Sequence, residues 1–135
     1  MPDMLHMDTL PKGCVAALAL LLFLLSVSIT VVRLRTKMLA GAPDDPTRLL
    51  AKLVRAQGNT AEYAAMLAVL IVMHGAAPRP AWVSTMMALA VAARVVFAAG
   101  MLLSPSLARF NIIRAVGACG TYVAGIALAL ALVIR

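Results

Sequence analysis

The chain has 135 residues, of which 64% are hydrophobic and 13% are charged. Soluble domains carry roughly 45–50% apolar and about 25% charged residues, so this composition excludes a soluble enzyme, a disordered protein and a disulfide scaffold. The formal net charge of +7, from 12 Lys and Arg against 5 Asp and Glu, indicates first how the chain is oriented in a membrane. We therefore expect one compact membrane domain over residues 1–135.

The first apolar block is Gly13–Val32, twenty residues without a charge between Lys12 and Arg33. A cleaved signal peptide is the alternative interpretation. Three observations speak against a signal peptide. Asp3 and Asp8 precede the block, the block is longer than the apolar part of a usual signal peptide, and no small-x-small cleavage site precedes Arg33. A retained transmembrane helix is the better prediction.

The second predicted helix covers residues 46–74. Asp45 can cap it, Pro46 suits its first position, and Gly75 with two prolines ends it after His74. Its length of about 43 Å exceeds a hydrocarbon core of about 30 Å, so about two turns should project into the cytosol.

Two further blocks complete the chain. Residues 81–103 are interrupted only by Arg94 and end before Ser104-Pro105, and residues 112–134 have Arg114 at their start. The predicted fold is all-α, a polytopic membrane protein built as a bundle of four transmembrane helices.

The distribution of Lys and Arg predicts the topology. Eight lie in the first connection, the start of the second helix and the third connection: Arg33, Arg35, Lys37, Arg48, Lys52, Arg55, Arg109 and Arg114. Three lie on the opposite side, Lys12, Arg79 and Arg135. The positive-inside rule therefore places both termini outside and loops one and three in the cytosol. Because no basic patch is interleaved with aromatic residues, nucleic acid is not an expected partner.

Glu62 and Arg94 are the acid and the base inside the predicted spans. Counted from the outer surface, Glu62 lies about 18 Å and Arg94 about 20 Å along their helices. Buried ionisable groups cost at least about 2.5–3.5 kcal/mol each unless they pair or line a wet cavity. We expect both in one polar cluster, within one subunit or across subunits; a purely structural ion pair is the alternative.

A polar stripe follows the second helix. At 100° per residue, Arg48, Lys52, Arg55, Asn59 and Glu62 share one face, beside Tyr63, and the face becomes apolar farther along. This gradient suits a ligand with an anionic head and a deeper apolar partner. Snorkelling cations with one interhelical hydrogen bond would give the same spacing.

The remaining residues indicate packing rather than chemistry. Cys14 and Cys119 form neither a disulfide framework nor a metal pattern, and no metal is expected. His74 and Trp82 are expected at the membrane interface. The four-residue spacing of Gly117, Thr121 and Gly125 predicts a close-packing face.

The segment Arg55-Ala56-Gln57-Gly58-Asn59-Thr60-Ala61-Glu62-Tyr63 resembles the signature of the MAPEG superfamily, the membrane-associated proteins in eicosanoid and glutathione metabolism. The family pattern is Arg-Ala-(His/Gln)-x-Asn-x-x-Glu at the start of the second of four helices. Three further stretches resemble the microsomal glutathione transferase and prostaglandin E synthase type. They are Arg33-Leu34-Arg35-Thr36-Lys37 with Ala42-Pro43-Asp44-Asp45, Ala93-Arg94-Val95-Val96, and Ser104-Pro105 with Arg109.

The resemblance implies a homotrimer with glutathione bound as co-substrate between neighbouring subunits. It implies that glutathione is held by Arg33, Arg55, Asn59, Glu62, Tyr63 and Arg94. The family's thiolate-stabilising, catalytic arginine matches Arg109 best, with Arg114 as the second candidate. The implied activity is a membrane transferase or peroxidase acting on hydrophobic electrophiles or lipid hydroperoxides in the bilayer.

Phe97 and Met101 depart from close relatives, which carry tyrosines or a histidine there; neither side chain donates a hydrogen bond that would hold glutathione. Two other functions stay open: a non-catalytic lipid-binding or scaffold protein of the same superfamily, and a small four-helix transporter. The second substrate, the choice between conjugation, peroxide reduction and isomerisation, and the host membrane, bacterial inner membrane or endoplasmic reticulum, also stay open.

Overall fold

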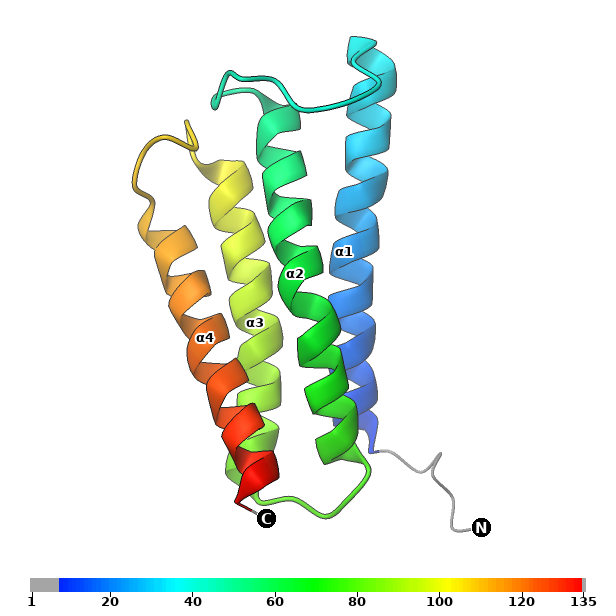
Figure 1. Cartoon of the computed structure of the whole chain (residues 1–135), viewed down its shortest axis with the longest axis vertical. Helices are drawn as coiled ribbons and strands as arrows, with labels where there is room; N and C mark the ends of the chain where they lie inside the picture. Colours follow the sequence, from blue (N-terminus) through cyan, green and yellow to red (C-terminus); the bar gives the residue numbers. More distant parts are fainter. Residues whose placement is uncertain (1–7, 135) are drawn as a thin grey trace.

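The computed structural model describes residues 8–134 and arranges them as four long α-helices side by side (Figure 1). The helices are α1 (Thr9–Thr36), α2 (Leu49–Gly75), α3 (Ala81–Leu103) and α4 (Ile112–Val133). No strand occurs within residues 8–134, so the prediction of an all-α fold is confirmed. Asp3 and Arg135, used above in the signal-peptide and topology arguments, lie outside the described residues.

Three of these helices, α1, α3 and α4, are long and apolar enough to cross a membrane. In α2, Lys52, Arg55 and Glu62 lower the mean hydropathy. This explains why composition alone does not mark α2 as a candidate membrane span. However, α2 begins at the end of the bundle where α1 stops and ends where α3 begins (Figure 1). It therefore runs the full height of the bundle beside the three apolar helices.

The start of α2 differs from the prediction, since the helix begins at Leu49 rather than at residue 46. The Asp45 carboxylate accepts hydrogen bonds from the backbone N–H and the hydroxyl of Thr47, at 2.9 and 2.6 Å. This local turn, in which an aspartate bonds to the residue two positions on, competes with helix capping. Arg48 is consequently extended and precedes the first turn.

Glycines bring α3 and α4 into backbone contact, the closest packing in the bundle. A Cβ atom on Gly117 would lie 2.4 Å from the backbone nitrogen of Phe97, and one on Gly100 would lie 2.5 Å from that of Arg114. Gly117 thus belongs to a close-packing face, as its spacing predicts. Gly125 has more room, because its Cβ would be 3.7 Å from the Leu67 side chain of α2.

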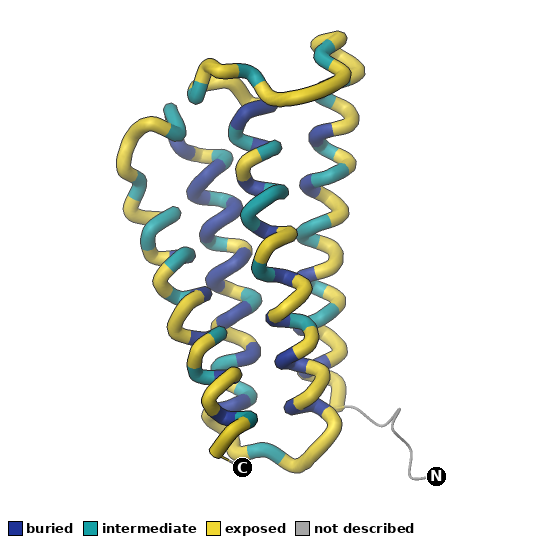
Figure 2. The backbone as a smooth tube through the Cα atoms, in the orientation of Figure 1, coloured by how far each residue is buried: buried dark blue, intermediate teal, exposed yellow. Residues whose placement is uncertain are grey.

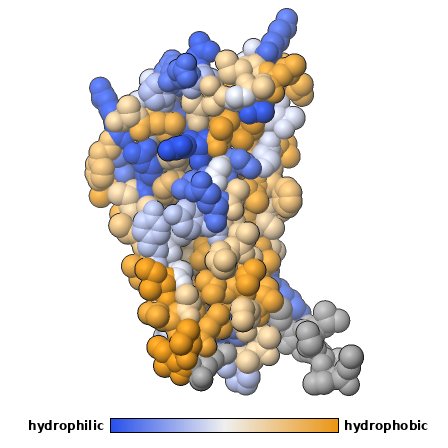
Figure 3. All heavy atoms as spheres, viewed as in Figure 1, coloured by the Kyte–Doolittle hydropathy of each residue, from blue (hydrophilic) through white to orange (hydrophobic). Residues whose placement is uncertain are grey.

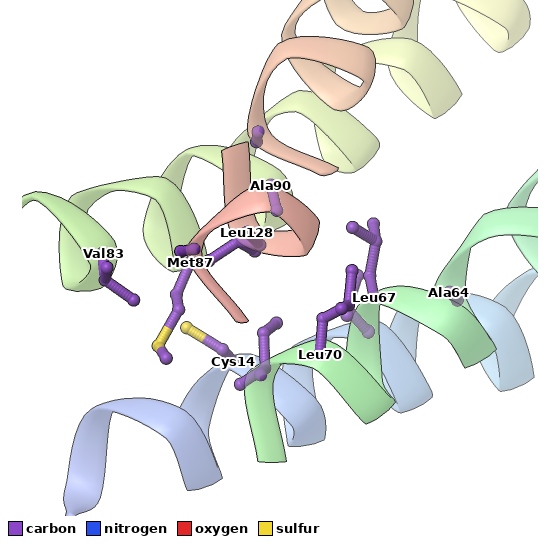
Figure 4. Packing of buried hydrophobic residues seen from close by; sticks show 12 residues of the cluster. Cys14, Ala64, Leu67, Leu70, Val83, Met87, Ala90 and Leu128 are labelled. Carbon is purple, nitrogen blue, oxygen red and sulfur yellow. The ribbon is translucent and has the colours of Figure 1, made fainter. Parts of the chain in front are cut away.

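Buried side chains follow the inner faces of the helices, while the outer faces of α1 and α4 are mostly exposed (Figure 2). One core cluster includes Cys14, Leu67, Met87 and Leu128, and therefore joins all four helices (Figure 4). Phe23, on α1, is 67% exposed, as expected for a side chain that faces lipid.

His74 lies in the last turn of α2 and is fully buried within the bundle. Its Nε2 lies 2.8 Å from the backbone carbonyl oxygen of Leu128. A carbonyl only accepts, so this nitrogen carries the proton and donates. The His74 hydrogen bond therefore links the end of α2 to α4. Trp82 is 49% exposed near the start of α3, where an interface anchor is expected.

Candidate functional site

A polar pocket of about 580 Å³ lies between α2, α3 and α4 towards the end of the bundle that carries the α1–α2 and α3–α4 loops. Its volume falls within the roughly 300–1,000 Å³ of typical ligand sites. Hydrophilic residues gather in the upper half of this face, and hydrophobic residues cover most of the lower half (Figure 3). The lining residues are Val54, Arg55, Gly58, Asn59, Glu62, Phe97, Met101, Leu107, Arg114 and Tyr122.

Helix α2 supplies the largest polar share of this lining. Arg55, Gly58, Asn59 and Glu62 are spaced three, four and seven residues apart, which places them on one side of a helix. A Cβ atom on Gly58 would meet nothing within 4 Å, so the missing side chain leaves open space. The structure thus brings three predicted site residues, Arg55, Asn59 and Glu62, to one pocket.

Arg94 lies directly behind the pocket and is 1% exposed. Its Nη2 donates to the Asn59 side-chain oxygen at 2.7 Å and to the Thr60 hydroxyl at 3.4 Å. The guanidinium also lies 5.2 Å from the Tyr63 ring centroid and 4.7 Å from that of Phe97, distances typical of cation–π contacts. Because Asn59 accepts from Arg94, its amide nitrogen is left to donate into the pocket.

Glu62 and Arg94 form no ion pair within the described residues of one chain. Glu62 is exposed, whereas Arg94 is buried and bonds to Asn59. Asn59 is bonded to Arg94 and lines the same pocket as Glu62.

Arg114, rather than Arg109, faces the pocket. Arg114 donates to the Leu107 carbonyl at 3.2 Å, the Arg109 carbonyl at 3.3 Å and the Met101 sulfur at 3.8 Å. No carboxylate within residues 8–134 pairs with it. Arg109 is exposed and absent from the lining. The Asn111 side chain caps α4 by accepting from the Arg114 backbone N–H at 3.1 Å, which fixes this first turn.

Arg33 is not part of this pocket within one chain. Helix α1 lies on the far side of α2 from α4 (Figure 1), and no α1 residue lines the pocket. Arg33 instead donates to the Gly41 carbonyl at 2.9 Å and to the Leu39 carbonyl at 3.5 Å. Its guanidinium thereby holds the first loop against the end of α1.

An apolar groove of about 320 Å³ lies between α2 and α4. Apart from Tyr63, Tyr122 and Thr121, its lining consists of Met, Leu, Ile, Ala and Gly side chains. Tyr63 lines this groove but not the polar pocket, while Tyr122 lines both. Their rings are 5.9 Å apart at an angle of 50°.

Tyr122 was missed by sequence reasoning. One signal could have identified it: it is the only tyrosine beyond α2 and stands eight residues after Arg114 in the fourth apolar block. Such a spacing keeps two side chains within about 80° of each other on a helix.

The charges of the polar pocket favour an anionic ligand that also carries a cation. Arg55 and Arg114 can bind carboxylates through paired donors, and Arg94 adds a third positive charge behind Asn59. Glu62 can accept from an ammonium group. Phe97 and Met101 supply apolar walls without hydrogen-bond donors. The described residues contain no group of three or more potential metal-ligating side chains.

Comparison with known proteins gives one family. The model of the MAPEG family matches residues 12–134, which is nearly the whole chain. No match was found among curated proteins or solved structures.

Proposed function

Because the chain belongs to the MAPEG family, we propose that it is a glutathione-dependent membrane transferase or peroxidase acting on hydrophobic electrophiles or lipid hydroperoxides. The family and the apolar helices make it an integral membrane protein related to glutathione and eicosanoid metabolism. One observation carries the proposal: Arg55, Asn59, Glu62 and Arg114 converge on one pocket. Glutathione carries carboxylates, an ammonium group and a thiol: Arg55 can bind a carboxylate, Glu62 can accept from the ammonium group, and Arg114 is left for the thiol.

Arg114 is the group that we assign to the thiol. A fixed cation beside a thiol lowers the thiol pKa, and the resulting thiolate is the nucleophile. Arg114 is held by the Leu107 and Arg109 carbonyls and has no competing carboxylate among the described residues. The exposed Arg109 contributes its carbonyl to this arrangement rather than its guanidinium.

We also propose a homotrimer, with glutathione bound between subunits and open to the cytosol. Arg33 would then reach the pocket from a neighbouring subunit, because within one chain it lies beyond α2. The proposed topology keeps both termini outside and loops one and three cytosolic, in a bacterial inner membrane or the endoplasmic reticulum.

A glutathione titration of the purified protein in detergent or lipid tests this function. Wild-type protein should bind glutathione and develop the ultraviolet absorbance of a thiolate. Arg114→Ala should lose this absorbance and lower kcat/KM for a small aryl halide about tenfold or more, whereas Arg109→Ala should retain both. Absence of glutathione binding by the wild type would refute the proposal, and the reverse pattern in the two variants would reassign the arginine.

A second candidate is a non-catalytic lipid-binding protein of the same family, which the apolar groove favours. This alternative predicts that lipid or glutathione copurifies with the protein but that neither an aryl halide nor an organic hydroperoxide is turned over. Measurable turnover that depends on Arg114 would exclude it.

A further inference from the structure

Met101 is a readily oxidised side chain in contact with the arginine that we assign to the thiol. It lines the polar pocket and is 4% exposed, and its sulfur lies 3.8 Å from Nη1 of Arg114. None of the other methionines that the structure describes lines this pocket. Met66 and Met73 are exposed on α2, and Met87 is buried in the core cluster that joins all four helices (Figure 4). Met101 is therefore the thioether that a reagent bound in the pocket meets.

The chemical state of this sulfur decides how much of the Arg114 charge is left for a ligand. A thioether is only a weak hydrogen-bond acceptor. The other contacts of Arg114 are with the backbone carbonyls of Leu107 and Arg109, and no carboxylate within residues 8–134 pairs with it. Oxidation to a sulfoxide converts the apolar Met101 side chain into a polar one and adds a strongly accepting oxygen. That oxygen would compete with a thiolate for the guanidinium donors.

We propose that Met101 is oxidised by hydroperoxides and that its sulfoxide, hydrogen-bonded to Arg114, lowers the activity of the pocket. This inference rests on the proposed glutathione function and on the assignment of Arg114 to the thiol. Hydroperoxides are among the proposed substrates, so the oxidant enters the same pocket. With glutathione bound, its thiolate reacts with the hydroperoxide. Without glutathione, the Met101 sulfur is the nucleophile that remains, and its oxidation records a shortage of the co-substrate.

The oxidation transfers one oxygen atom and two electrons. A lone pair of the Met101 sulfur attacks the hydroperoxide oxygen that carries hydrogen, so that an S–O bond forms while the O–O bond breaks. The proton moves to the departing alkoxide oxygen, and the products are a sulfoxide and an alcohol. The sulfur is oxidised, the hydroperoxide is reduced, and no further reagent is consumed. Because Arg114 can donate to the departing oxygen, the reaction should favour Met101 over methionines that face lipid.

Mass spectrometry after treatment with cumene hydroperoxide tests where the oxygen is added. Cys14→Ala and Cys119→Ala are introduced first, so that no thiol of the described chain competes for the peroxide. Met101 should gain one oxygen atom when glutathione is absent. Glutathione sulfonate, an analogue without a thiol, should protect Met101 by filling the pocket but should not protect the exposed Met73. Equal oxidation of Met101 in protein saturated with the analogue would contradict a reaction within the pocket.

Activity measurements test the consequence of oxidation. Oxidised protein, freed of peroxide, should show a weaker thiolate absorbance with glutathione and a kcat/KM for the aryl halide about tenfold lower at neutral pH. Met101→Leu, a substitution that conserves volume, should fold and should keep its own activity through the same treatment. Met73→Leu, at an exposed position outside the pocket, is the control and should be inactivated like the parent. Each variant is compared with its own untreated sample, so a change in basal activity does not enter the comparison.

The pH profile separates an effect on Arg114 from damage to packing. A sulfoxide that occupies the Arg114 donors should raise the pKa of the bound thiol. The loss of activity should then be large at neutral pH and should shrink above about pH 8.5, where a thiol ionises without help. Oxidation leaves the charged and titratable groups around the pocket in place, namely Arg55, Glu62, Arg94, Arg114 and Tyr122. Damage to packing would instead lower kcat/KM by the same factor at every pH.

The outcomes separate the two levels of the proposal. The role of Met101 is overturned, and the glutathione function stands, if Met101 resists the peroxide or if its oxidation leaves the thiolate absorbance unchanged. The same holds if Met101→Leu is inactivated as strongly as its parent, or if the loss is independent of pH. If untreated protein binds no glutathione, both fall.

Discussion

Arg94 serves the polar pocket without lining it. Its charge is buried between the Tyr63 and Phe97 rings and bonded to Asn59, which forms part of the pocket wall. Burying a charge is costly unless it is hydrogen-bonded, and here the aromatic rings and Asn59 share that task. Its Nε remains buried without a partner among the described residues. Arg94 therefore acts as a positioning residue that fixes the orientation of the Asn59 amide.

Gly58 gives a direct test of the pocket at the residue scale. Because a Cβ there meets nothing within 4 Å, Gly58→Leu should project into the pocket without disturbing the fold and should abolish glutathione binding. Gly58→Ala is the matched control; it should retain binding and gain up to about 1 kcal/mol of stability from helix propensity. Titration of both variants with glutathione tests whether the polar pocket is the glutathione site. Undiminished binding by the leucine variant would contradict that assignment.

Asp45 predicts a pH dependence at the first loop. Hydrogen bonds from the Thr47 hydroxyl and backbone hold the pKa of this carboxyl below its ordinary value of 3.8. A depressed folded-state pKa stabilises the fold above the ordinary value, and this stabilisation is lost as the pH falls through the lower one. We expect the acid-induced loss of thermal stability below about pH 4 to be smaller in Asp45→Asn, which cannot titrate. Melting curves from pH 6 to pH 3 measure this difference, and identical pH profiles would refute it.

Residue positions could be predicted from the sequence along a helix but not always around it. Counting residues predicts a common depth for Glu62 and Arg94, since the rise per residue is constant. Their rotation depends on which neighbour each helix packs against, so the buried bond from Arg94 to Asn59 was not foreseen. The choice between Arg109 and Arg114 depends on the path of the α3–α4 loop, which no periodicity describes.

At the scale of elements, the hydrophobic blocks predicted the helices well because long apolar runs must satisfy their backbone groups internally. Helix α3 covers the same residues, 81–103, as its predicted span, and α4 ends one residue short of its own. The ends of α1 extend beyond the apolar block on both sides, since Pro11 is tolerated in a first turn and Arg33–Thr36 continue the helix. The start of α2 was missed because Asp45 bonds to Thr47.

The contact between α3 and α4 yields an element-scale prediction. Gly117→Ala would place a Cβ 2.4 Å from the Phe97 backbone nitrogen, so the helices must separate. Overpacking of this kind costs about 1–3 kcal/mol, and the shift should also weaken glutathione binding, because Phe97 and Arg114 line the pocket. Gly13→Ala, where a Cβ meets nothing within 4 Å, is the control. Thermal denaturation in detergent compares the two; equal stability would disprove the contact.

At the scale of the whole molecule, the start of α1 and the end of α4 lie at the same end of the bundle (Figure 1). The polar pocket lies towards the opposite end, where the two loops and the adjoining helix ends together carry most of the Lys and Arg residues. The sequence could predict this polarity from charge counting. It could not predict that α1 would stand apart from the pocket, because helix order in the chain does not fix helix neighbours in space.

Two loop alanines test the proposed topology. Ala42 and Ala77 are both exposed and lie at opposite ends of the bundle. In a chain with Cys14→Ala and Cys119→Ala, a membrane-impermeant maleimide added to intact cells or sealed vesicles of known orientation should label Ala77→Cys at once. Ala42→Cys should react only after permeabilisation. Labelling in the opposite order would invert the topology.

The backbone contact between α3 and α4 also has a consequence for motion. At Gly100 and Gly117 no side chain separates the two backbones, so α3 and α4 cannot slide past each other without breaking these contacts. Arg114, Phe97 and Met101 then stay fixed relative to one another. A wider pocket would therefore require a shift of α2, whose contact with α4 is looser at Gly125, or of the loop contact between the Leu107 N–H and the Pro46 carbonyl at 3.0 Å. This hydrogen bond links the α1–α2 loop to the α3–α4 loop beside the pocket, since Leu107 also belongs to the pocket lining.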